Sequence, residues 1–383
     1  MILHKGLVYR TEQQRFEAMD VWVKNEKIQG VGAPGAFDQI DDERVDVTGY
    51  WLVPGLVDVH THGRTGYDFI SCSEEKLGIM AADYARQGVT TVMPTLETAS
   101  YDRMLAATDQ LNRFVPKQDQ ASFCGVHWEG RYLNPAKKGA HDEGLLAMPR
   151  AAELDSEILR GCRKLHVSVA LELDEDGSFA KAAQEMGATL GLAHTAATYA
   201  EAKRAEEMGI VSYTHLFNAM PSLHHRDGGA VCAALEGDRI AELISDGIHI
   251  APEMIRLVYR NKGVEQISLV SDSMSAAGCA DGTYKVCGMS VTVKDGIARN
   301  DASGVLAGST LSLNTAVNRF AEFSGIPLSR ALVSATATPA KQVGIYDVVG
   351  SIDKGKQADV LLLQTPDRLM PARILLRGKW LTP

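Results

Sequence analysis

LVPGLVDVHTHG, residues 52–63, is a run of apolar and β-branched residues that ends in two histidines. Such a run is typical of a strand buried on both faces of a parallel sheet. Segments with apolar residues three and four positions apart, such as EEKLGIMAADYARQ at 74–87, are typical of amphipathic helices. Seven further strand-like runs alternate with such segments, at 89–95, 122–129, 166–172, 188–194, 211–217, 241–249 and 267–273. Eight buried strands alternating with helices predict a (β/α)8 TIM-like barrel.

The two ends of the chain have another pattern, in which short alternating strands are separated by turns. DVWVKNEKIQGVG near the start and ARILLRGKWLTP at the end are examples. Chain termini often lie close together in compact proteins. We therefore expect residues 1–53 and 346–383 to form one small β-sandwich domain beside a barrel domain of residues 54–345.

Composition excludes several classes of protein. An apolar fraction of 45% with 23% charged residues is that of a globular protein with a large core. A net charge of −9, with no basic run longer than Lys137-Lys138, argues against a nucleic-acid partner. Neither an export signal nor about 18 consecutive apolar residues is present, so we expect a cytoplasmic protein with no membrane partner. The six cysteines form no CxxC pair, which argues against a disulfide framework and a thiolate zinc site.

Ionisable residues end or follow the predicted strands, where a buried strand by itself would not require them. In a barrel of this kind the carboxyl ends of all strands converge on one mouth, where catalytic groups lie. The residues concerned are His60, His62, Glu129, Glu172, His194, His215, His249 and Asp272. We expect these side chains to share one site.

Five of these residues have the chemistry of metal ligands. His60 and His62 point to the same side of an extended strand, because side chains alternate with period two, so both can bind one ion. Glu129 follows a buried strand, where an unpaired carboxylate would be costly. His194 and His215 offer neutral imidazoles, which suit zinc, iron, manganese or cobalt. We predict one or two divalent ions per chain, with zinc as the first choice.

Asp272 has a different predicted role. Hydrolysis at a metal site still needs a group that takes a proton from water and delivers it to the leaving group. A carboxylate at the end of the eighth strand can do both, although Asp is also a favoured residue for capping the segment that follows.

Seven stretches carry a resemblance to a known family. They are HTHG (60–63), HWEGRYLNPAKKGAH (127–141), GLAHTAAT (191–198), THLFNAMPSLHHR (214–226), DGIH (246–249), SDSMSAAG (271–278) and LAGSTLSL (306–313). In order and spacing they resemble the signature stretches of the N-acetylglucosamine-6-phosphate deacetylases of the amidohydrolase superfamily. The resemblance implies a barrel flanked by a β-sandwich, a homodimer, and hydrolysis of the N-acetyl group of an amino-sugar 6-phosphate to acetate and the free amine.

The resemblance also implies roles for individual residues. Glu129, His194 and His215 match the main metal ligands, His60 and His62 match those of a second metal, and Asp272 matches the general acid and base. Asn218, Ala219 and Arg226 match phosphate contacts. The remaining sugar contacts would be Ala140, His141, His249, Leu306, Ala307 and Gly308.

Departures from the family pattern leave the substrate open. Arg131 replaces the usual Pro after the Glu129-Gly130 pair, and we expect it to add a positive charge close to the metal. Asp227-Gly228-Gly229 replaces Glu-Pro-Gly. The galactosamine epimer, another phosphorylated amide, or a cyclic amide of the dihydroorotase or hydantoinase kind are the alternatives, although the last group commonly bridges two metals with a carboxylated lysine.

Overall fold

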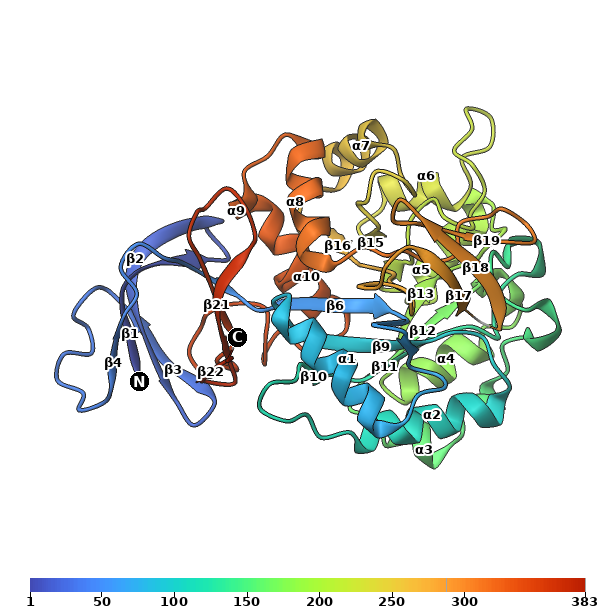
Figure 1. Ribbon diagram of the computed structural model, residues 1–383. Coiled ribbons are helices and arrows are strands. Elements are labelled where there is room, and N and C mark those ends of the chain that lie inside the picture. The colour runs from blue at the N-terminus through green and yellow to red at the C-terminus, as the bar shows by residue number, and fades with distance from the viewer. Residues whose placement is uncertain (287, 383) are drawn as a thin grey trace.

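A barrel of eight parallel strands forms the centre of the computed structural model, which describes residues 1–286 and 288–382 (Figure 1). Backbone hydrogen bonds from Asp272 N to the oxygen of His60 and from His62 N to the oxygen of Ser273 join the eighth strand segment to the first. The predicted barrel is thereby confirmed. Its strands are β6 (Leu56–Thr61), β9 (Val89–Leu96), β11 (Val126–Glu129), β12 (Leu165–Val169), β13 (Thr189–Leu192), β14 (Ser212–Tyr213), β15 (Ile240–Leu243) and β16 (Ile267–Leu269).

Helices surround these strands and bury their apolar faces against them. In α1, for example, Leu77, Met80, Ala81 and Tyr84 are buried, at the spacing that the sequence predicts. The longer helices are α1 (Glu74–Arg86), α2 (Tyr101–Arg113), α4 (Ser178–Glu185), α5 (Tyr199–Glu207), α6 (Gly229–Glu236), α7 (Pro252–Lys262) and α8 (Leu313–Ser324). The shorter ones are α3 (Glu157–Arg160), α9 (Leu328–Ala331) and α10 (Ala337–Gln342).

Both ends of the chain meet in one eight-stranded sheet, at the left of Figure 1. The link is the antiparallel pairing of β5 with β20, which places Leu52 opposite Leu362. This sheet has its own core, which includes Leu3, Val8, Val21 and Leu375. The separate terminal β domain that the sequence predicts is therefore present. Its strands are β1 (Ile2–Arg10), β2 (Arg15–Lys24), β3 (Lys27–Gly32), β4 (Arg44–Asp46), β5 (Trp51–Pro54), β20 (Val360–Leu363), β21 (Pro371–Leu376) and β22 (Lys379–Trp380).

A small antiparallel sheet after β16 is absent from the sequence prediction. It consists of β17 (Gly282–Val286), β18 (Met289–Lys294) and β19 (Ile297–Asn300), and it lies over the barrel mouth (Figure 1). Asp295-Gly296, with φ of 53° and 72°, forms the turn between β18 and β19. An Asp-Gly pair between alternating residues is a strong hairpin signal, and it would have revealed this sheet.

Four of the eight barrel strands, β12, β14, β15 and β16, end three to six residues before their predicted ends. β12 ends at Val169, so Glu172 lies in a following 3₁₀ turn, where its carboxylate accepts hydrogen bonds from Asn134 and Thr195. β15 ends at Leu243, and His249 follows six residues later in a loop. No helix in the described part of the chain is long and apolar enough to cross a membrane.

Candidate active site

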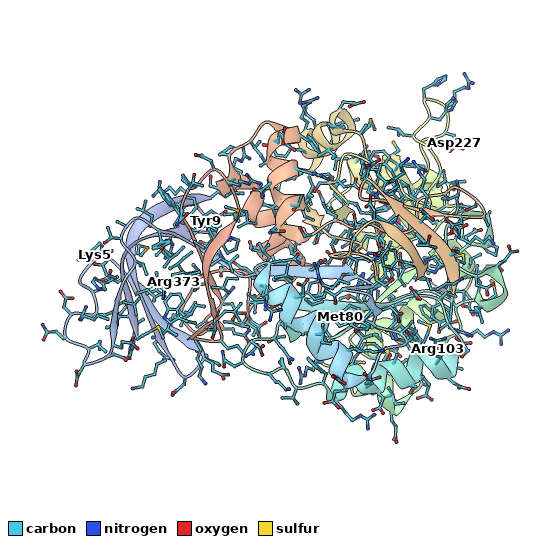
Figure 2. The ribbon with its side chains drawn as sticks, viewed as in Figure 1. Lys5, Tyr9, Met80, Arg103, Asp227 and Arg373 are labelled. Carbon is cyan, nitrogen blue, oxygen red and sulfur yellow. The ribbon has the colours of Figure 1, made fainter. Side chains whose placement is uncertain are left out.

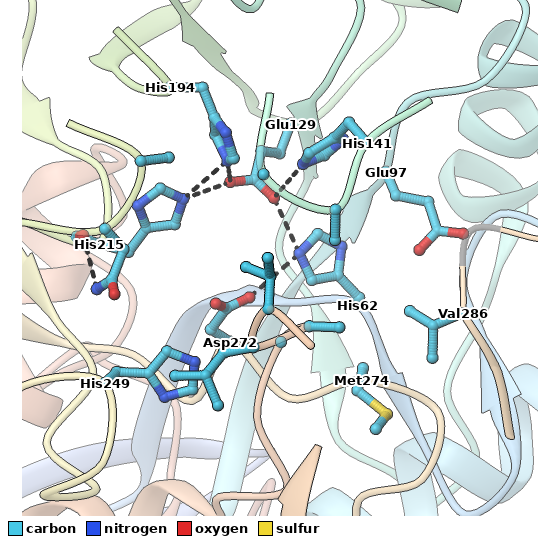
Figure 3. A pocket seen from close by; sticks show the side chains of 18 of the residues that line it. His62, Glu97, Glu129, His141, His194, His215, His249, Asp272, Met274 and Val286 are labelled. Carbon is cyan, nitrogen blue, oxygen red and sulfur yellow. Dashed lines mark hydrogen bonds and ion pairs between the residues drawn. The ribbon is translucent and has the colours of Figure 1, made fainter. Parts of the chain in front are cut away.

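Glu129, at the end of β11, lies at the centre of a group of histidines (Figure 3). Its Oε1 lies 2.8 Å from Nε2 of His215 and 3.4 Å from Nε2 of His194, and these two nitrogens are 3.2 Å apart. All three side chains are almost fully buried. One carboxylate oxygen and two imidazole nitrogens thus converge on one point, which is the ligand set predicted for the main metal.

The second oxygen of Glu129 faces His60, in β6, and His62, which directly follows β6. Oε2 lies 2.9 Å from Nε2 of His62 and 3.3 Å from Nε2 of His60. Oδ1 of Asp272 lies 3.3 Å from the same nitrogen of His62 and 3.6 Å from that of His60. Glu129 therefore stands between two pairs of histidines, in the position of a bridging ligand.

The outer ring nitrogens fix the direction of the inner ones. Nδ1 of His194 lies 2.8 Å from the backbone oxygen of Lys137, to which it can only donate. Nδ1 of His60 lies 3.0 Å from Oε2 of the fully buried Glu242. When these rings are neutral, with the proton on Nδ1, they present lone pairs at Nε2, and Nε2 of His60 is buried without a hydrogen bond. Lone pairs and carboxylate oxygens that face one another require a shared cation, so the residues fit a metal centre.

The pKa values of these groups describe the metal-free protein. Burial lowers the pKa of His62, but hydrogen bonds to Asp272 and Glu129 outweigh it and raise the pKa to about 10. Burial raises the pKa of Asp272, yet its hydrogen bond to His62 and the charges of His60 and His62 lower it to about 2. The pKa of Glu129 falls well below its usual range, because the charge of His60 and hydrogen bonds to His194 and His215 outweigh burial. Without metal, protons on the histidines balance these carboxylates.

A pocket of about 450 Å³ opens above this centre. Thirteen of the predicted site residues line it, while His60 lies fully buried beneath. They are His62, Glu129, Ala140, His141, His194, His215, Asn218, Ala219, His249, Asp272, Leu306, Ala307 and Gly308.

Glu172, which was expected at the same site, does not line the pocket, and Arg226 is a second predicted residue that the structure places elsewhere. It is exposed, and its guanidinium lies 2.8 Å from Nε2 of His225. Its loop, marked by Asp227 in Figure 2, projects away from the barrel. Within one chain, Arg226 does not line the pocket.

Two predicted sugar contacts have defined orientations. Nδ1 of His141 lies 2.8 Å from the hydroxyl of Thr98, and its Nε2 lies 3.9 Å from Oε2 of Glu129. Burial and the charge of His194 lower the pKa of His141 to about 3, so this ring is neutral and could also serve as a ligand, since Glu129, His141 and His194 form a compact group. Nδ1 of His249 lies 2.6 Å from the carboxylate of Asp246, and this contact fixes the ring at the pocket wall.

The structure adds residues that the sequence did not single out. Glu97, directly after β9, and Lys137 both line the pocket. Glu97 lies two residues after the predicted strand at 89–95, which is the one strand for which the sequence prediction named no polar end residue. A search for an ionisable residue just after that strand would have found it. Glu242 lies inside the barrel beneath His60, and its carboxylate contacts Nδ1 of that histidine. Nothing in the run AELI indicates this contact, because His60 is distant in sequence.

Arg131, whose charge was expected close to the metal, does not line the pocket. Its guanidinium carbon lies over the ring of Tyr101, 5.7 Å from the ring centroid, and its Nη2 lies 3.5 Å from Glu153. Residue 131 has a left-handed φ of 64°, which turns the chain sharply after Gly130. The charge that replaces the family's proline is therefore paired with Glu153, and neither residue lines the pocket.

Comparisons with known proteins agree with this geometry. The model of the Amidohydrolase family matches residues 51–381. The N-acetylgalactosamine-6-phosphate deacetylase of Escherichia coli O157:H7 is 35% identical over 82% of this chain and 84% of its own. The N-acetylglucosamine-6-phosphate deacetylase of Lysinibacillus sphaericus is 31% identical over 91% of this chain and 90% of its own.

A solved structure extends the similarity to the whole fold. A mutant N-acetyl-D-glucosamine-6-phosphate deacetylase from Mycobacterium smegmatis, in complex with N-acetyl-D-glucosamine-6-phosphate, superposes with a TM-score of 0.89 at 28% identity. The match covers 100% of this chain and 99% of that one. With a family model that spans most of its length and the histidine-carboxylate centre in place, this chain belongs to the amidohydrolase family.

Proposed function

We propose that this protein hydrolyses the N-acetyl group of an N-acetyl amino-sugar 6-phosphate, with N-acetylglucosamine-6-phosphate as the first candidate. The observation that carries the proposal is the position of Asp272, whose carboxylate faces the ligand histidines inside the pocket. The names of the similar deacetylases support the substrate class. The protein's expected place is the cytoplasm, and its expected assembly is a homodimer.

The proposed chemistry is direct hydrolysis, in which Asp272 takes part in two successive transfers of one proton. A bound divalent cation would supply Lewis-acid activation of the attacking water and the amide carbonyl. Asp272, held as a carboxylate, accepts the proton of that water and then donates it to the departing amine nitrogen. The imidazole of His249 lines the same pocket and is positioned to stabilise charge on the amide oxygen.

We propose that Glu129, His194 and His215 hold the main cation and that His60 and His62, with Glu129, hold a second. Zinc is the first choice, with iron, manganese or cobalt as alternatives, because nitrogen and oxygen ligand sets accept all of them. Replacing His60 and His62 together by Asn should lower the metal content by one ion per chain. A wild-type protein that never takes up more than one ion in excess metal would exclude the second site.

The galactosamine epimer is a second candidate, since the 35% identical relative carries that name. A cyclic amide is less favoured as the substrate. Enzymes of that kind commonly have a carboxylated lysine between the two metals, and here Glu129 lies between the two histidine pairs. The test is acetate release from N-acetylglucosamine-6-phosphate, N-acetylgalactosamine-6-phosphate and both unphosphorylated sugars, with dihydroorotate assayed separately. A preference for an unphosphorylated sugar, or turnover of the cyclic amide alone, would exclude the proposed substrate class.

A further inference from the structure

The pocket contains few groups that could balance a phosphate dianion. Glu97, Glu129 and Asp272 line it, and all three are acidic. Among the described residues that line the pocket, Lys137 is the one side chain with a permanent positive charge. A 6-phosphate that enters this pocket therefore needs either Lys137 or a cation from outside.

Lys137 lies next to the segment expected to hold the phosphate. It ends a short 3₁₀ turn, η1 (Pro135–Lys137), and its Nζ donates a hydrogen bond of 3.2 Å to the backbone oxygen of Met220. Met220 directly follows Asn218 and Ala219, which line the same pocket. An ammonium group with three donors can keep this one bond and still offer two to a ligand.

The same residue also touches the metal centre through its backbone, because its oxygen accepts the hydrogen bond from Nδ1 of His194. The position of this turn is thus tied to a metal ligand on one side and to the 218–220 segment on the other. Arg226, by contrast, is exposed on a projecting loop.

We propose that the ammonium group of Lys137 binds the 6-phosphate of the substrate and so determines the preference for phosphorylated sugars. The proposal rests on the function proposed above. The competing role is purely structural, with Lys137 acting only as a link between its own turn and Met220. Only the phosphate-binding role requires a positive charge at residue 137. A neutral hydrogen-bond donor at this position could keep the bond to Met220 but would not attract the phosphate anion.

The test compares Lys137→Gln with Lys138→Gln in the metal-loaded enzyme. Gln at 137 can still donate to Met220 but has no charge. Lys138 is a matched control, because it is adjacent, pairs with Glu143 at 3.2 Å, and does not line the pocket. Lys137→Gln should lower kcat/KM for the phosphorylated sugar by about 10- to 150-fold, the range for a charge-assisted contact. The fall in kcat/KM for the unphosphorylated sugar should be at least about tenfold smaller. Lys137→Arg should restore part of the preference for the phosphorylated sugar. Lys138→Gln should have the kcat/KM of the wild type for both sugars.

A binding measurement separates this proposal from the proposed function. Inorganic phosphate, titrated calorimetrically into the metal-loaded proteins, should bind wild type and Lys138→Gln with similar affinity and Lys137→Gln at least about tenfold more weakly. Equal phosphate binding by all three, or equal losses on both sugars, would overturn the role of Lys137. If Arg226→Gln removes the preference and Lys137→Gln does not, the cation comes from the projecting loop and the proposal is also overturned. A wild type that binds phosphate through Lys137 but releases no acetate would contradict the proposed function alone.

Discussion

Three ionisable residues of the candidate site share an unusual backbone conformation. His194, His215 and Asp272 have φ values of 43°, 30° and 47°, a region that residues other than glycine seldom adopt. Each follows the end of a barrel strand by two or three residues, so the left-handed turn redirects its side chain toward the barrel axis. Backbone strain of this kind persists where the surrounding structure fixes it, and it concentrates at functional sites.

Replacing Asp272 by Asn tests its role as the proton carrier. The amide has nearly the same shape and can still accept a hydrogen bond from His62, so fold and metal content should be retained. Because it cannot take or give the proton, kcat should fall by about 10²- to 10⁴-fold. Steady-state rates, metal analysis and thermal unfolding of the same preparation give the answer. Activity within a few-fold of wild type would remove Asp272 from the mechanism.

Metal binding should compete with protons at His62. In the metal-free protein its pKa is about 10, so the ring is protonated at pH 7, whereas Asp272 and Glu129 have lowered pKa values and carry no proton there. The metal must displace the proton, so apparent affinity should rise with pH toward 10, by about tenfold per unit for each proton released. Calorimetry at pH 7 in buffers of different ionisation enthalpy measures the release. An absence of proton release would show that His62 is already neutral.

At the scale of strands and helices, the sequence predicts what depends on local pattern. Alternation and apolar runs locate the barrel strands, and the convergence of their ends explains why Glu129, His194 and His215 meet. The partner of Glu242 could not be predicted, because its contact with His60 joins the seventh strand to the first across the barrel interior. The outward position of Arg226 could not be predicted either, since a loop's direction depends on the packing around it.

Glu242, in β15, should increase the metal affinity of His60 by accepting a hydrogen bond from its Nδ1. Its carboxylate accepts from Nδ1 of His60 and, at 2.6 Å, from the amide of Gln342. Glu242→Gln keeps the shape but provides a weaker acceptor, so metal affinity at the His60 and His62 pair should fall by about 10- to 100-fold. Chelator competition measures this affinity, and occupancy of the other pair serves as an internal reference.

The control for Glu242→Gln is Glu206→Gln, in α5. Glu206 is another buried carboxylate, and its Oε1 accepts a hydrogen bond of 2.8 Å from Tyr213 rather than from a metal ligand. If both variants lose metal equally, the effect comes from a disturbed core and not from the orientation of His60.

At the scale of the whole molecule, the terminal sheet is fastened to the end of the barrel opposite the pocket. The hydroxyl of Tyr9 donates a 2.5 Å hydrogen bond to the backbone oxygen of Ser329. Arg377, which is buried, donates to the backbone oxygens of Lys117 at 2.5 Å and Gln120 at 2.9 Å, and to the hydroxyl of Ser122 at 3.0 Å. These contacts hold the segment that leads into the third barrel strand.

Replacing Arg377 by Met should therefore weaken the junction without reaching the chemistry. Three acceptors would lose their donor in a buried place, and one such loss costs about 1–3 kcal/mol, so the free energy of unfolding should fall by at least about 2 kcal/mol. Amides of residues 117–123 should exchange faster in hydrogen-exchange measurements, because their anchor is lost, whereas kcat should stay close to wild type. Lys379→Met, at an exposed position on β22, is the matched control for loss of charge. A fall in kcat for Arg377→Met, with metal content retained, would show instead that the terminal sheet controls the geometry of the pocket across the length of the barrel.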